Sequence, residues 1–247
     1  RCFVEGKFYK LFALLFGMGF AVMLLRAREV GRPFGAWFTR RMLALWVLGI
    51  AHMVFLLEAI MGATGQNMSI TNVLSLVSWI ITVSMLVFAR TIPNLILLPV
   101  VFGFASLSVL ASLLIPVSYI MHIELQPGLV IHISLSLFAY CTLVIAFLYA
   151  LQMSYITYRL KQKGAALLHS SLPPLMLVEG ILFKLILAGT CLLSVSLLSG
   201  FIFLEDMFNK TYAHKTVLSI SALVVYLILL VGQKLRGWRG RQVIILT

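Results

Sequence analysis

PGLVIHISLSLFAYCTLVIAFLYALQMSYITY, residues 127–158, is an apolar run that can cross a membrane as one helix. At about 1.5 Å per residue it is longer than a hydrocarbon core of about 30 Å, so one end should project into water. It carries a single histidine, His132, near its first end. An imidazole there is either a helix-end polar group that water satisfies or one ligand of a pair.

The composition places the whole chain in the membrane. Of its 247 residues, 62% are hydrophobic and 11% are charged, whereas soluble domains carry about 25% charged residues. Repeated apolar runs of helix-spanning length predict an all-α, polytopic transmembrane helix bundle. We expect about seven spans: Phe8–Leu25, Met42–Met61, Ile70–Ala89, Ile92–Ile115, Leu129–Tyr158, Ile181–Leu204 and His214–Gly232.

The basic residues set the predicted orientation. A net charge of +12 would suggest a nucleic-acid partner in a soluble protein, but here the Lys and Arg residues lie in alternate short loops. The loops after the second, fourth and sixth spans contain only one of them, Lys210. The positive-inside rule therefore makes the basic loops and the C-terminus cytoplasmic. We expect a multi-pass membrane protein, whose partner is the lipid bilayer and not nucleic acid.

This orientation brings two histidines to one membrane face. The fifth and seventh spans both begin outside, so His132 and His214 should lie near the outer surface. His122 falls in the outer loop before the fifth span. The second span carries His52 and Glu58, whose six-residue spacing puts them on different helix faces. His52 is therefore expected either to bond a serine or a backbone carbonyl or to serve a function.

The residues favour binding over catalysis. The chain has no GxSxG, Walker or HExxH motif and only seven acidic residues, so we expect no enzyme activity. Two outer histidines under apolar helices suit haem, because haem iron takes axial imidazole and the porphyrin needs an apolar slot. His132 and His214 are thus the candidate ligands of haem iron. Small residues near the end of the sixth span are expected to serve close helix packing: Ser194, Ser196, Ser199 and Gly200.

Five stretches carry a resemblance to a known family: GQNMSITNVLSLVSW at 65–79, PGLVIHISLSLFAY at 127–140, LPPLMLVEGILFK at 172–184, HKTVLSISALVVY at 214–226 and GWRGR at 237–241. Residues 58–247 resemble the YpjD/HemX branch of the CcsA-like cytochrome c assembly family. The resemblance implies an inner-membrane protein that handles haem through outer-face histidines, which fall on His132 and His214. The tryptophan-rich haem-presenting segment of the cytochrome c synthetases is absent, so the resemblance implies haem binding rather than haem delivery.

Residues 1–57 are similar instead to part of DUF418, a family of multispanning proteins. We therefore expect two segments, a DUF418-like two-helix segment at 1–57 and a CcsA/YpjD-like membrane domain at 58–247. The leading hypothesis is a HemX-like assembly protein that binds haem without catalysis. The alternative is a cofactor-free accessory subunit of a membrane transporter or ion-efflux system, with another inner-membrane protein as its partner. A DUF418-type acyl transfer role ranks last.

Overall fold

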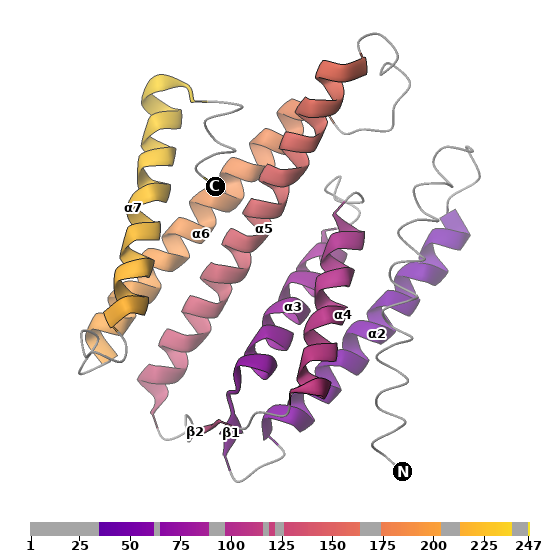
Figure 1. Cartoon of the computed structure of the whole chain (residues 1–247), viewed down its shortest axis with the longest axis vertical. Coiled ribbons are helices and arrows are strands. Elements are labelled where there is room, and N and C mark those ends of the chain that lie inside the picture. The colour runs from indigo at the N-terminus through magenta and orange to yellow at the C-terminus, as the bar shows by residue number, and fades with distance from the viewer. Residues whose placement is uncertain are drawn as a thin grey trace. The chain divides into compact units, whose positions relative to one another are not determined.

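A computed structural model gives the structure of the chain and describes residues 35–61, 65–88, 97–115, 119–121, 126–163, 174–203, 213–238 and 247. The chain divides into two compact units, unit 1 (Arg1–His122) and unit 2 (Ile123–Thr247). The described elements are almost all helical, which confirms the all-α prediction. Figure 1 shows the elements of each unit in turn.

Unit 1 contains three described helices and a small sheet. The helices are α2 (Gly35–Met61), α3 (Ile70–Val87) and α4 (Leu98–Leu114), and α3 packs against both of the others. Strands β1 (Gln66–Asn67) and β2 (Ile120–Met121) pair antiparallel; β1 precedes α3 in the sequence and β2 follows α4. Ser69 caps α3 by accepting a bond from the backbone N–H of Asn72 at 3.4 Å. The sheet and the cap fix where α3 begins.

Polar bonds join the helices of unit 1. The indole Nε1 of Trp79 on α3 donates to the carbonyl oxygen of Gly49 on α2 at 2.7 Å. On another side of α3, Ser108 Oγ of α4 donates to Ser78 Oγ at 2.9 Å, and both serines are fully buried. In hydrocarbon the apolar surface of a helix gains little from meeting another helix, so such bonds and close packing hold a bundle together.

Unit 2 contains the longer helices α5 (Pro127–Lys163), α6 (Leu175–Phe203) and α7 (Ala213–Arg236). They run in alternate directions, and α6 packs against both α5 and α7 (Figure 1). Proline opens α5 because the first turn needs no N–H from it. The 37 residues of α5 extend about 55 Å, so α5 is longer than the hydrocarbon core, as expected.

One hydrophobic cluster of unit 2 lies where its three helices meet. Its buried side chains are Ala139, Leu143, Leu193 and Leu197, and α7 contributes partly buried neighbours such as Ile220 and Leu223. Close approach of α5 and α6 depends on Gly189. A Cβ atom added there would lie 2.6 Å from Cδ2 and 2.8 Å from Cγ of Leu143, well inside van der Waals contact. Glycine thus lets the Leu143 side chain rest on the backbone of α6.

The count of spans differs from the expected seven. In the described part of the chain there are six helices, and five of them are long and apolar enough to cross a membrane. The fourth predicted span, Ile92–Ile115, contains α4, whose apolar stretch Val100–Ser112 is shorter than a span. The first predicted span, Phe8–Leu25, lies outside the described residues. The sixth begins at Leu175, six residues earlier than predicted, directly after Pro174.

Adding a side chain at Gly189 should destabilise unit 2. We predict that Gly189→Ala lowers the free energy of unfolding by about 1–3 kcal/mol, the usual cost of overpacking a filled core. Gly180→Ala is the matched control, because a Cβ atom at Gly180 on the same helix meets nothing within 4 Å. Thermal unfolding in a mild detergent measures both. Equal midpoints for the two variants would contradict the close packing at Gly189.

Candidate functional site

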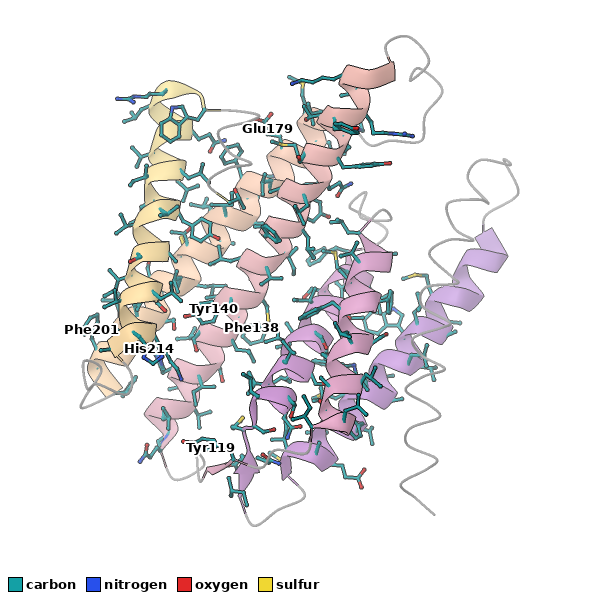
Figure 2. The ribbon with its side chains drawn as sticks, viewed as in Figure 1. Tyr119, Phe138, Tyr140, Glu179, Phe201 and His214 are labelled. Atoms are coloured by element: carbon teal, nitrogen blue, oxygen red, sulfur yellow. The ribbon has the colours of Figure 1, made fainter. Side chains whose placement is uncertain are left out.

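The two candidate ligands lie at the same end of unit 2. His132 is in the second turn of α5 and His214 is in the first turn of α7, and both helices begin at the end that the loop charges assign to the outer surface. Figure 2 shows His214 at this end of α7, with Phe201 near the end of α6. The predicted placement on one face therefore agrees with the arrangement of the helices.

The imidazole of His132 is held by α6. Its Nδ1 lies 3.0 Å from the carbonyl oxygen of Ser196 and 3.2 Å from Ser199 Oγ. Ser199 Oγ itself donates to the carbonyl oxygen of Ser196 at 2.7 Å. Both serines are buried, so these bonds form away from water. His132 thus belongs to the seam between α5 and α6 and is not simply a water-satisfied helix end.

These contacts select one tautomer of His132. A carbonyl oxygen can only accept, so Nδ1 must carry the proton that it donates to Ser196. In a neutral imidazole Nε2 then keeps its lone pair, on the side of the ring away from the bonded edge. Metal-bound histidines commonly have this arrangement, in which the other ring N–H bonds a backbone carbonyl and fixes the ring. The hydrogen bonds of His132 therefore leave Nε2 as the ring nitrogen that carries the lone pair.

His214 has a different environment. Its side chain is exposed, whereas Thr216, two residues later, is buried on the face of α7 that packs in unit 2. Two residues correspond to about 200° around a helix, so His214 lies on nearly the opposite side from Thr216. His214 is therefore accessible at the surface and takes no part in the packing of α7.

A hydrogen bond sets the level of α7 relative to α5. The hydroxyl of Tyr140 on α5 lies 2.6 Å from Ser219 Oγ on α7. His132 precedes Tyr140 by eight residues, about 12 Å, and His214 precedes Ser219 by five, about 7.5 Å. Because α5 and α7 run in the same direction, the two histidines lie at levels that differ by about one helical turn.

The structure thus brings the two histidines to one end and nearly one level, but not face to face. His132 points toward α6, whereas His214 lies on the exposed side of α7. The donor chemistry fits haem, since two imidazoles are the axial ligands of many haem proteins. Among the described residues no group of three or more His, Cys, Asp or Glu side chains could hold a metal ion. In the part of the chain that the structure describes, the two histidines at this end are therefore single imidazole donors with no metal-binding group around them.

The other intramembrane polar residues are accounted for in part. His52 Nε2 lies 2.9 Å from Ser75 Oγ, so this histidine bonds a serine on the neighbouring helix, which was one of its two expected roles. Glu58 is exposed and lies on another side of α2, as its spacing from His52 predicted. His122 lies outside the described residues.

Two residues of the site were expected only to serve helix packing. Ser196 and Ser199 are small residues near the end of α6, and the sequence pattern alone indicates close helix contact. Counting from the outer ends of antiparallel helices gives a better signal. His132 is six residues into α5, and Ser199 is five residues from the end of α6, so the two must lie at a similar depth.

Comparison with known proteins gives a family for most of the chain. The family model described as "Cytochrome C assembly protein" matches residues 36–247. It begins before Glu58, inside the segment expected to resemble DUF418, and the division into two segments stays a prediction. No solved structure gives a significant match to the chain.

The curated relatives include a full-length match. "Inner membrane protein YpjD" of Escherichia coli (strain K12) is 38% identical over 237 residues, which are 95% of this chain and 90% of that protein. YpjD of Escherichia coli O157:H7 matches to the same extent. A shorter match, to the "Uncharacterized 39.9 kDa protein in amylase 3'region" of Bacillus acidopullulyticus, is 42% identical over 53 residues, 22% of this chain and 15% of that protein. The chain therefore belongs to the cytochrome c assembly protein family and is a homologue of the inner membrane protein YpjD.

Proposed function

We propose that this protein binds haem at the outer end of unit 2, through His132 and His214, without catalysing a reaction. It would serve cytochrome c assembly as a binding or regulatory factor. Family membership supports a role connected with haem proteins but does not supply the ligands. The ligands are proposed from the chain's own residues.

The observation that carries the proposal is the bonding of His132. Hydrogen bonds from Nδ1 to α6 fix the ring and leave Nε2 with its lone pair. This bonding differs from that of a helix-end histidine satisfied by water, which was the other expectation for His132. Haem iron supplies a Lewis-acid centre that takes neutral imidazole nitrogen. His132 provides that nitrogen in a fixed orientation, which lowers the entropy cost of ligation.

His214 supplies the second imidazole from a more accessible position. It lies in the first turn of α7, where backbone N–H groups lack intrahelical partners and helices fray most readily. A ligand there can reorient without breaking the core around Leu223 and Leu193. We therefore assign unequal roles to the two histidines. His132 would be the fixed ligand of the haem iron, and His214 would reorient to supply the second ligand.

The tautomer of His132 provides a first test, one that needs no haem. We predict that His132 carries its proton on Nδ1 in the haem-free protein, because its partner at 3.0 Å is a carbonyl oxygen. ¹⁵N NMR of histidine-labelled protein in bilayers distinguishes the two neutral tautomers. The His132 signals are assigned by their loss in His132→Gln. A proton on Nε2 would show that Nδ1 is not held by Ser196.

Haem titration provides the second test. The purified protein should gain a Soret band when haem is supplied, and His132→Ala should raise the Kd at least about tenfold, the lower end of what even outer-shell losses cost at metal sites. His214→Ala should weaken binding less, since the fixed ligand remains. Absorption spectra recorded across the titration measure both effects.

His52→Ala is the matched control for these variants. It removes another intramembrane histidine, one that bonds Ser75 in unit 1, and should leave the Soret band unchanged. An unaltered Soret band in the His132→Ala/His214→Ala double variant would rule out the proposed site. A colourless wild-type protein that co-purifies with a second membrane protein would instead favour the accessory-subunit role.

A further inference from the structure

The inner end of α7 closes with a defined cap. Gly237 has a φ of +62°, in the left-handed region that side chains other than glycine rarely adopt. Its N–H donates to the carbonyl oxygen of Gln233 at 3.0 Å, and the N–H of Trp238 donates to that of Gly232 at 3.4 Å. This glycine cap satisfies two carbonyl groups that the helix end would otherwise leave open. It also reduces the exposed negative charge at this end of the helix.

The cap places the indole of Trp238 against α7. A Cβ atom added to Gly232 would lie 2.6 Å from Cδ2 of Trp238, so only glycine allows the ring to rest on the helix backbone. The side chain of Trp238 is half-buried by this contact. The ring therefore lies against the last turn of α7.

Arg236 lies on the same face as this ring. It follows Gly232 by four residues, one helical turn, whereas Lys234 lies two residues away and about 160° around the helix. Arg236 and Lys234 are exposed, and in the described part of the chain neither has an ion-pair partner. The indole N–H of Trp238 likewise meets no acceptor there, and it can only donate. Arg236 and Trp238 thus present adjacent unused donors.

We propose that Arg236 and Trp238 form a binding site for the phosphodiester headgroup of an anionic phospholipid. The guanidinium binds phosphate oxygens as a planar fork, and the indole N–H donates one further bond. No acidic residue occurs from 213 to 247, so nothing in this part of the sequence competes for the arginine. Loop charges assign this end to the cytoplasm, where anionic lipid headgroups lie at the level of interfacial Trp and Arg residues.

The apolar surface next to the site favours a lipid over free phosphate. Ile228 precedes Gly232 by four residues on the same face and is 52% exposed, and Leu235 beside them is 77% exposed. A phospholipid whose headgroup is bound at Arg236 would lay its acyl chains along this surface. A free phosphate ion would use the donors only.

The test uses the full chain in mixed micelles with phosphatidylglycerol or phosphatidylcholine, read by the midpoint of thermal unfolding. Phosphatidylglycerol should raise the midpoint of the wild-type protein, as any ligand specific for the folded state does. Arg236→Gln and Trp238→Leu should each lose most of that rise. Lys234→Gln, which removes the same charge from the same turn but from another face, should keep it.

Several outcomes would overturn the proposal. Equal losses in Lys234→Gln and Arg236→Gln would show a diffuse positive surface and no site. An equal rise with inorganic phosphate would show an anion site that does not recognise lipid. Midpoints in phosphatidylcholine alone report folding of each variant. If Arg236→Gln unfolds at a lower midpoint than wild type in phosphatidylcholine, Arg236→Lys is used in its place. A midpoint rise with phosphatidylglycerol as large in Arg236→Lys as in wild type would show that the guanidinium fork has no role.

Discussion

The hydrogen bond from His132 to the carbonyl oxygen of Ser196 holds the first turns of α5 to α6. In a membrane helix a polar side chain must find a partner within the protein, because hydrocarbon offers none. His132 finds its partner across the seam of α5 and α6, where Gly189 lets the two helices approach closely. The same bond therefore links α5 to α6 and fixes the orientation of the His132 imidazole.

Each unit has a membrane-helix histidine that bonds a neighbouring helix, but the two histidines use different ring nitrogens. In unit 1 His52 bonds Ser75 through Nε2. In unit 2 His132 bonds through Nδ1 and keeps Nε2. Two histidines in membrane helices thus differ in which nitrogen the helix packing uses. His52 joins helices of unit 1 through Nε2, whereas His132 joins helices of unit 2 through Nδ1.

The positions of the membrane spans were predictable from the sequence. The rotation of each helix in its bundle was not, and the reason is physical. Apolar length identifies a span, so five helices lie where the sequence placed them, and loop charge put His132 and His214 at one end. Periodicity alone does not fix how a helix is rotated in its bundle. The hydrophobic face of α7 is set by Thr216, Ile220 and Leu223 together with α5 and α6. The exposed position of His214, opposite that face, therefore required the structure.

The partners of His132 were hidden for a related reason. Ser196 acts through its backbone carbonyl, which every residue has, so its identity carries no signal. Ser199 resembles any small residue at a helix contact. Electron paramagnetic resonance of the ferric, haem-loaded protein tests whether His132 and His214 ligate the haem iron. Ligation by His132 and His214 predicts a low-spin signal from two axial imidazoles that is lost in His132→Ala, whereas the same signal in wild type and His132→Ala would contradict it.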